Sequence, residues 1–149
     1  MIIRKAEYKD LPEINSIEEL CFPEDTAFPV HMLAYLIRYA ETLVADQTNI
    51  EGFIIGHVSE GVGSIYTLDV HPSHRRKGIG HLLIQMLEDI LQAKGAKKIR
   101  LEVAGNNVAA LSLYRKAGYI EGEIIKNYYG GEKHAVRMYK NLNQSFDFV

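Results

Sequence analysis

The chain has 149 residues, enough for one domain that buries roughly 70% of the surface its unfolded form exposes. Its 47% hydrophobic and 24% charged residues are typical of a water-soluble globular protein, and a net charge of −2 provides no overall basic field to recruit nucleic acid. Cys21 is the only cysteine, which excludes an internal disulfide and favours a reducing, cytoplasmic location.

Two further classes of protein are disfavoured by the sequence. Met1–Lys5 lacks the apolar run of a signal peptide, and no stretch approaches the length of a membrane span. His71 and His74 come close to the spacing of metal ligands, but they lie in a proline-containing turn without a neighbouring acidic residue or cysteine. We therefore expect no membrane partner and no metal site.

The N-terminal half predicts strands and two amphipathic helices. Asp10 is expected to cap a helix whose apolar side includes Cys21, a position that favours a buried thiol over a nucleophile. Phe22–Asp25 interrupts the helical pattern, and a second helix begins near Val30. The predicted strands are Ile2–Ala6, Thr42–Asp46, Gly52–Ser59 and Val62–His71. Short turns make the last three antiparallel neighbours.

The basic turn that follows Pro72 is the most informative segment of the chain. Gly78 and Gly80 open a helix, and without side chains they let backbone N–H groups approach a bulky anion closely. The first N–H groups of a helix lack partners inside the helix and favour phosphate. Arg75–Lys77 add positive charge at the same place. The pattern predicts a pyrophosphate cradle, although a solvated basic turn fits the two glycines alone equally well.

The C-terminal half predicts alternating helices and strands. The predicted elements are a helix from Gly78 to Gly95, a strand Lys97–Val103, a helix Asn107–Ala117, and strands Tyr119–Lys126 and Lys133–Lys140. The strand–helix–strand order over residues 63–103 implies a right-handed crossover and one parallel strand pair. We therefore predict a single α/β domain with a mixed, mostly antiparallel sheet flanked by helices.

Two motifs in this order resemble the GNAT superfamily of acetyl-CoA-dependent N-acetyltransferases. Arg75–Gly80 fits its Gln/Arg-x-x-Gly-x-Gly/Ala cofactor motif, and Asn107–Tyr119 fits its Asn-x-x-Ala-x-x-Leu-Tyr-x-x-x-Gly-Phe/Tyr signature. The resemblance implies a GNAT domain over residues 1–142, with the tail 143–149 unassigned. It also implies a sheet that splays open between the strand ending near His71 and the strand containing Glu102, with acetyl-CoA bound in the opening.

The resemblance assigns cofactor-binding roles to three segments. The implied residues are Leu68, Asp69, Val70, Arg75, Arg76, Lys77, Gly78, Ile79, Gly80, His81 and Asn107. The first three are expected to bond the pantetheine arm through main-chain groups, and the Asp69 side chain is not expected to be catalytic. Asn107 is expected to cap its helix and to bond the same arm.

Two catalytic residues follow from the same resemblance. Glu102 would accept the proton of the acceptor amine through ordered water, and Tyr114 would protonate the departing thiolate. Each residue has an alternative interpretation. Glu102 can be a solvated carboxylate beside Arg100, and Tyr114 can be an ordinary core tyrosine.

Within the superfamily, the chain is most similar to protein N-terminal acetyltransferases of the ribosomal-protein type and their archaeal and eukaryotic relatives. This similarity rests on Leu101–Val103, Asn127–Tyr129 and Leu20–Glu24. It implies that a protein or peptide N-terminus is the acceptor and that the enzyme is a monomer or weak homodimer. The implied acceptor-binding residues are Phe22, Glu24, Tyr128 and Tyr129.

Two departures from the pattern leave alternatives open. Ala104-Gly105 replaces a bulkier residue after Leu101–Val103, and Glu24 is a second candidate base. A small-molecule acetyltransferase acting on a polyamine, amino acid or amino sugar would use the same cofactor groove. A non-catalytic acetyl-CoA-binding module would need neither Glu102 nor Tyr114.

Overall fold

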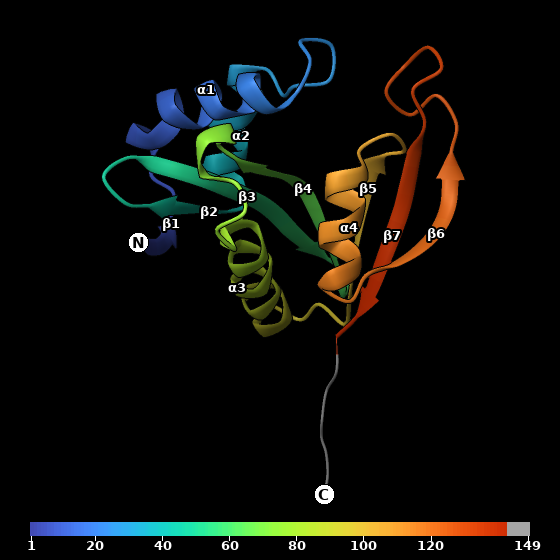
Figure 1. The fold of residues 1–149 in the computed structure, drawn as a ribbon. Coiled ribbons are helices and arrows are strands. Elements are labelled where there is room, and N and C mark those ends of the chain that lie inside the picture. The colour runs from blue at the N-terminus through green and yellow to red at the C-terminus, as the bar shows by residue number, and fades with distance from the viewer. Residues whose placement is uncertain (143–149) are drawn as a thin grey trace, which may run out of the picture. The chain divides into compact units, whose positions relative to one another are not determined.

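A computed structural model describes residues 1–142, so the predicted tail 143–149 lies outside the described residues. Seven strands form a sheet in the order β1-β2-β3-β4-β5-β7-β6 (Figure 1). The elements are β1 Ile2–Lys5, the short 3-10 helix η1 Tyr8–Asp10, α1 Leu11–Cys21, α2 Val30–Tyr39, β2 Glu41–Asp46, β3 Ile50–Ser59, β4 Val62–Val70, η2 Pro72–His74, α3 Ile79–Ala93, β5 Lys98–Ala104, α4 Val108–Lys116, β6 Ile120–Ile125 and β7 Ala135–Asn141. This confirms the α/β class and the predicted order of elements.

The sheet is mixed, as the crossover predicted. β4 and β5 are parallel, with partners running from Val62 and Lys98 to Ile65 and Leu101. The pairs β1–β2, β2–β3, β5–β7 and β6–β7 are antiparallel. The opening expected further along β4 and β5 involves both of the compact units described next, and it stays a prediction.

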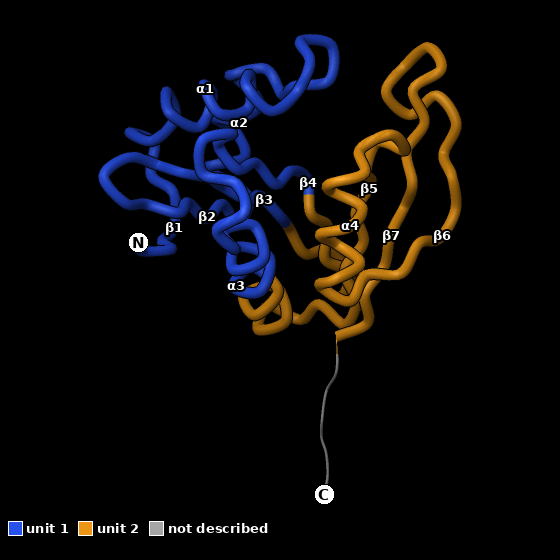
Figure 2. The backbone as a smooth tube through the Cα atoms, viewed as in Figure 1, with its two compact units in different colours: residues 1–56, 66–87 blue, residues 57–65, 88–149 orange. Residues whose placement is uncertain are grey.

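Internal contacts divide the chain into two compact units (Figure 2). Unit 1 comprises residues 1–56 and 66–87, and unit 2 comprises residues 57–65 and 88–149. The apolar sides of α1 and α2 form the core of unit 1 together with residues of β2 and β3. The core residues are Ala6, Ile14, Ile17, Leu33, Leu36, Ile37, Ala40, Val44, Ile50, Phe53 and Ile55.

Gly52 brings β3 close to the segment that carries the basic turn. A Cβ at Gly52 would lie 2.8 Å from the Asp69 main-chain oxygen and 3.4 Å from Cγ2 of Ile79. Only glycine permits this approach, because a Cβ at 2.8 Å from a backbone oxygen would force the strands apart. The close packing fixes the end of β4 and the first turn of α3 within unit 1.

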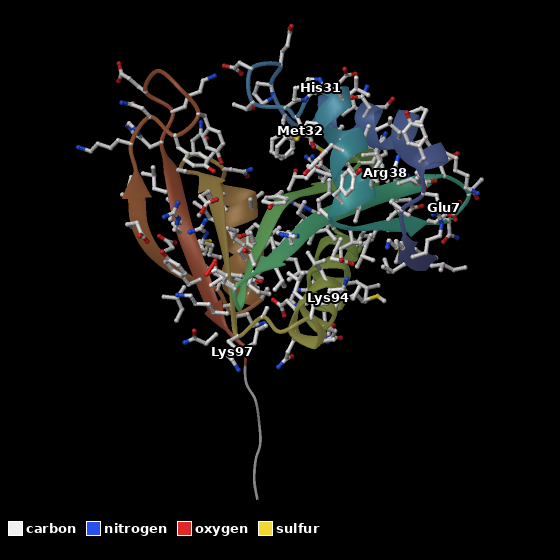
Figure 3. The ribbon with its side chains drawn as sticks, turned by 180° about the vertical axis from the view of Figure 1, so that it is seen from behind. Glu7, His31, Met32, Arg38, Lys94 and Lys97 are labelled. Atoms are coloured by element: carbon white, nitrogen blue, oxygen red, sulfur yellow. The ribbon has the colours of Figure 1, made fainter. Side chains whose placement is uncertain are left out.

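The outward side of α2 is aromatic as well as polar. His31, Met32 and Arg38 are exposed on this helix (Figure 3). The rings of Tyr35 and Tyr39 lie 4.8 Å apart, and the Arg38 guanidinium lies 5.7 Å from the centroid of Tyr39. These contacts order the surface of α2 without adding to the core.

Asp10 does not cap α1 as predicted. Its buried carboxylate accepts hydrogen bonds from Nη1 and Nη2 of Arg4 at 2.8 and 2.9 Å, and from the Glu7 N–H at 2.7 Å. The chain enters α1 through η1, so Asp10 already has helical backbone angles when α1 begins. Its side chain therefore turns back to β1 and η1, and the pKa of Asp10 is lowered chiefly by Arg4.

Unit 2 is built on strands with one apolar side. Ile99, Leu101 and Met138 are buried, whereas Arg100 on the other side of β5 is exposed. α4 lies beside β5 and β7 in this unit (Figure 1). A Cβ at Gly63 would lie 3.1 Å from side-chain atoms of Ile99 and Leu91, which explains a residue without a side chain at this point of β4.

A polar network is buried in the same unit. The Glu88 carboxylate accepts hydrogen bonds from the Tyr119 hydroxyl at 2.8 Å and from the Lys140 ammonium at 2.9 Å. Lys140 also donates to the Ala117 carbonyl at 2.7 Å, at the C-terminal end of α4. The network thus joins α3, α4 and β7.

None of the helices within residues 1–142 is both long and apolar enough to cross a membrane.

Candidate functional site

The backbone angles of the basic turn favour a concave row of N–H groups. Arg76 and Gly78 have positive φ angles of 67° and 81°, and α3 begins directly afterwards at Ile79. Alternation of left-handed residues with a helix start points successive N–H groups to one side and makes an anion-binding concavity. Residues 75–78 are exposed, whereas Ile79 and Gly80 are buried at the start of the helix and His81 is exposed. The backbone angles agree with the predicted pyrophosphate cradle, whose binding role stays a prediction.

Two of the cationic side chains in this turn, Arg75 and Lys77, contact other residues of the chain. Arg75 donates from Nε to the Val70 carbonyl at 3.1 Å and from Nη2 to Sγ of Cys21 at 3.4 Å. Nζ of Lys77 lies 3.1 Å from Nδ1 of His74. Arg75 therefore ties the turn to β4 and α1. Because this guanidinium is already engaged with the protein, we expect the backbone N–H groups to be the main part of the predicted cradle.

The predicted segment Leu68–Val70 forms the end of β4. Leu68 and Val70 are half-buried, whereas the Asp69 side chain is 1% exposed. No sequence pattern predicted a buried carboxyl group at this position. Its Oδ1 lies 2.6 Å from the Thr67 hydroxyl, and its Oδ2 has no hydrogen-bond partner among residues 1–142.

The predicted acceptor loop begins where α1 ends. Phe22 is half-buried and Glu24 is exposed. Cys21 is half-buried rather than fully buried as expected, and its Sγ accepts a hydrogen bond from Nη2 of the exposed Arg75. Desolvation is the main reason that the pKa of its thiol rises to about 11, so Cys21 stays protonated and is a poor nucleophile at neutral pH.

Glu102 lies among polar partners on β5, β7 and the loop before β7. Its Oε2 accepts a hydrogen bond from Nε of Arg137 at 2.8 Å, and Nε of Arg100 lies 4.0 Å away. Its Oε1 accepts from the Tyr128 hydroxyl at 3.3 Å. The pairing with Arg100 was expected, but the closer one with Arg137 was missed, since it depends on the register that places Glu102 opposite Arg137. Both oxygens are oriented, and each keeps a lone pair for a further proton.

Tyr128 and Tyr129 form an aromatic pair on the loop between β6 and β7. Their rings are 4.9 Å apart and nearly perpendicular. Asn127 has a positive φ of 59°, and its N–H donates to Nδ1 of His134 at 2.9 Å, which closes the loop. Burial is the main reason that the pKa of Tyr129 rises to about 12, and burial followed by the Glu102 charge raises the pKa of Tyr128. Both hydroxyls therefore stay protonated and can donate hydrogen bonds.

α4 carries the two remaining predicted residues. The Asn107 side chain accepts a hydrogen bond from the Ala110 N–H at 3.1 Å, which confirms the predicted cap. Tyr114 is 6% exposed, and its ring lies edge-on to Tyr119 with centroids 5.5 Å apart. This packing fixes the ring, and it is compatible with both predicted roles of Tyr114.

The predicted residues thus fall into two sets. Unit 1 holds the basic turn, the end of β4 and the acceptor loop with Phe22 and Glu24. Unit 2 holds Glu102, Tyr114, Asn107 and the tyrosine pair, and it brings Glu102 and Tyr128 into contact. No group of three or more metal-ligating side chains occurs among the described residues.

Comparisons with known proteins bear on both sets. The family model described as Acetyltransferase (GNAT) family matches residues 11–119, which include the basic turn, Glu102 and Tyr114. The chain is 30% identical over 131 residues to the [ribosomal protein bS18]-alanine N-acetyltransferase of Escherichia coli K12, covering 85% of this chain and 86% of that protein. It is 31% identical over 144 residues to an uncharacterized N-acetyltransferase of Methanocaldococcus jannaschii, covering 94% and 91%.

A solved structure agrees with these matches. The crystal structure of the ribosomal-protein-S18-alanine N-acetyltransferase from Escherichia coli superposes with a TM-score of 0.85 at 25% identity. The superposition covers 97% of this chain and 96% of that one.

Proposed function

The chain belongs to the acetyltransferase (GNAT) family, and from this premise we propose that it transfers the acetyl group of acetyl-CoA to the α-amine at the N-terminus of a protein. The observation that carries the proposal is the contact of Glu102 with Tyr128. It joins a carboxylate suited to accept a proton to the tyrosine-bearing loop that is expected to hold a peptide N-terminus. Relatives named as acetyltransferases of a ribosomal protein's alanine support the same acceptor class.

The chemistry requires a neutral amine and a protonated leaving group. An α-amine has a pKa near 8, so it is partly protonated at neutral pH and benefits from a base. Glu102 receives the amine proton through an ordered water molecule, while Arg137 and Tyr128 hold the carboxylate in place. As the amine nitrogen bonds to the acyl carbon and the carbon–sulfur bond breaks, Tyr114 would give its hydroxyl proton to the leaving thiolate. The proton accepted by Glu102 is released to solvent, and Tyr114 regains one from solvent. Acetyl-CoA supplies the activated acyl group.

The cofactor is held mainly by backbone groups. The N–H groups of residues 76–81 would hold the pyrophosphate, in a row favoured by the positive φ angles at Arg76 and Gly78. Main-chain groups of Leu68–Val70 and the Asn107 side chain would bond the pantetheine arm. The reaction takes place in the cytoplasm, with the enzyme as a monomer or weak homodimer.

A screen of acceptors tests this function. The purified chain and acetyl-CoA are incubated with peptides varied at their first two residues, and products are identified by mass spectrometry. The same peptides with a blocked α-amine but free lysines serve as the matched control. We expect acetylation of α-amines only. Acetylation confined to polyamines, amino acids or amino sugars would indicate a small-molecule enzyme, and calorimetric binding of acetyl-CoA without turnover would indicate a binding module.

A further inference from the structure

Three buried polar side chains connect α1 to the end of β4 in unit 1. Glu18 is 1% exposed, Thr67 is 7% exposed and Asp69 is 1% exposed. The Thr67 Oγ1 lies 2.6 Å from Asp69 Oδ1 and 3.4 Å from Glu18 Oε1. The other Glu18 oxygen, Oε2, accepts a hydrogen bond from the Phe28 N–H at 2.9 Å. The cluster therefore links three segments that are distant in sequence.

The contacts among Thr67, Asp69 and Glu18 indicate that the two carboxyl groups hold a proton between them. A hydroxyl carries one hydrogen and can donate to only one of two carboxylates. The Thr67 hydroxyl donates to Oδ1 of Asp69 at 2.6 Å, and the Asp69 and Glu18 carboxyl groups, which are also hydrogen-bonded to each other, share a proton. The pair then carries one negative charge, and the Phe28 N–H donates to Oε2 of Glu18. This arrangement avoids two buried charges side by side.

No cationic side chain is hydrogen-bonded to Glu18 or Asp69 among the contacts of the described residues. Arg75 bonds the Val70 carbonyl and the Cys21 sulfur rather than either carboxyl group, and Cys21 is a neutral thiol that donates to the same carbonyl at 3.4 Å. Burial, followed by the neighbouring Glu18, raises the pKa of Asp69 well above its usual range. A protonated Asp69 follows from both the geometry and the electrostatics.

The cluster sits at both ends of the loop between α1 and α2. Glu18 precedes the loop in the last turns of α1, and Phe28 lies near the loop's far end. Between them lie Phe22 and Glu24, the residues assigned to the acceptor. The Glu18–Phe28 hydrogen bond closes the loop, and the relay through Thr67 fastens it to β4.

We propose that Glu18 and Asp69 are positioning residues, joined by Thr67, that hold the acceptor loop against the end of β4 and so set the affinity for the acceptor amine. The inference rests on the proposed function, since it takes the loop with Phe22 and Glu24 to be the acceptor side of the site. The relay works only while Asp69 keeps its proton, so acceptor affinity is expected to weaken at alkaline pH.

Steady-state kinetics of Glu18→Ala test the loop contact. Loss of a charge-assisted hydrogen bond to Phe28 is expected to raise the acceptor KM about tenfold, with kcat and the KM for acetyl-CoA changed less than about twofold. Glu19→Ala, an exposed neighbour on the same helix, is the matched control and should leave all three constants unchanged. A Glu18→Ala enzyme with a wild-type acceptor KM would overturn the proposal.

The pH profile separates positioning from a merely structural role. Asp69→Asn offers an oxygen to the Thr67 hydroxyl and an NH2 group to Glu18 at every pH, so the ratio of wild-type to variant acceptor KM should rise between about pH 7 and 10. The ratio removes the effect of amine ionisation, which both enzymes share. A flat ratio would show that the proton on Asp69 does not act on the acceptor. Thr67→Val, which interrupts the relay, should raise the acceptor KM at all pH values.

A measurement without turnover keeps this inference separate from the proposed function. Amide hydrogen exchange of residues 22–29 should be about tenfold faster in Glu18→Ala than in Glu19→Ala, with exchange in α4 unchanged. If the wild-type enzyme acetylates only free amines, the proposed acceptor is wrong, and the KM of that amine replaces the peptide KM in the same comparison. Unchanged exchange in the loop would overturn the positioning role whatever the acceptor.

Discussion

Glu102 and Asp69 carry the same functional group in opposite electrostatic settings. Glu102 in unit 2 accepts a hydrogen bond from the Arg137 guanidinium, which balances its charge. Asp69 in unit 1 is almost fully buried, and its side chain contacts a hydroxyl rather than a cation. Its charge is removed by a proton instead. The comparison teaches that the nearest partner, and not the carboxyl group itself, decides whether the group can act as a base or as a hydrogen-bond donor.

Asp10 completes this comparison within unit 1. It is buried like Asp69, with 4% of its surface exposed, but Arg4 donates two hydrogen bonds to it. The pKa of Asp10 is lowered and that of Asp69 is raised. Changing Glu102, Asp10 or Asp69 to its amide is the same chemical change, but we expect a different result for each residue.

The largest expected effect is that of Glu102→Gln on turnover. Glutamine keeps the shape and the hydrogen bond from Arg137, with its NH2 group facing the Tyr128 hydroxyl, but it cannot accept the amine's proton. We expect kcat/KM to fall by about 10²–10⁴-fold, with partial recovery at higher pH, where more of the amine is neutral. Kinetics on an N-terminal peptide from about pH 6 to 9 measure this.

Tyr114→Phe is the control for that recovery, because it removes a proton donor and its defect should not be repaired by higher pH. Full activity of Glu102→Gln at neutral pH would place the base elsewhere, with Glu24 as the next residue to test.

Asp10→Asn should have the largest effect on stability. The amide loses the charge that balances Arg4 and one of the two parallel hydrogen bonds, at a cost of about 2–3 kcal/mol in the free energy of unfolding. Because the pKa of Asp10 is depressed in the fold, its contribution is present above the ordinary carboxyl pKa and is lost as pH falls through the depressed value. Chemical denaturation at neutral and acid pH should show the difference shrinking in acid. A constant difference would contradict the ion-pair explanation.

The sequence predicted the order of elements and the parallel strand pair because these depend on local periodicity and on turn residues. The Asn107 cap was predictable for the same reason, since its partner Ala110 lies three residues away. The role of Asp10 was not predictable in this way, because Arg4 on β1 binds its carboxylate. A local capping rule does not include a partner on another element.

The hydrogen-bond partners of the candidate site residues could be identified only from the folded structure. Arg137 meets Glu102 from 35 residues away, through the register of β5 and β7. Glu18 did leave a signal that was overlooked. It lies four residues after Ile14 and three before Cys21, on the apolar side of α1. A charged residue at that spacing predicts a buried polar contact.

Glu88→Gln tests a buried carboxylate balanced by a cation away from the candidate site. The amide oxygen can still accept from Lys140, but its NH2 group would face the Tyr119 hydroxyl in place of an acceptor. We expect a loss of about 1–2 kcal/mol in the free energy of unfolding, measured by urea denaturation. Asp89→Asn, its neighbour on α3, is the control. An equal loss in both variants would show that the network in unit 2 contributes nothing of its own.

The smallest effect at neutral pH is expected for Asp69→Asn, and its sign should change with pH. A group whose pKa is raised by folding binds its proton more tightly in the folded state, so wild-type stability falls as pH rises from the ordinary carboxyl pKa to the raised one. The slope for one such proton is at most about 1.4 kcal/mol per pH unit. Asparagine does not titrate, so the variant should gain on the wild type as the pH is raised through neutrality. Thermal unfolding of both proteins from about pH 5 to 9 measures the difference in stability. If the two stability curves run parallel over this pH range, Asp69 is ionised in the fold, and it resembles Glu102 more closely than its burial indicates.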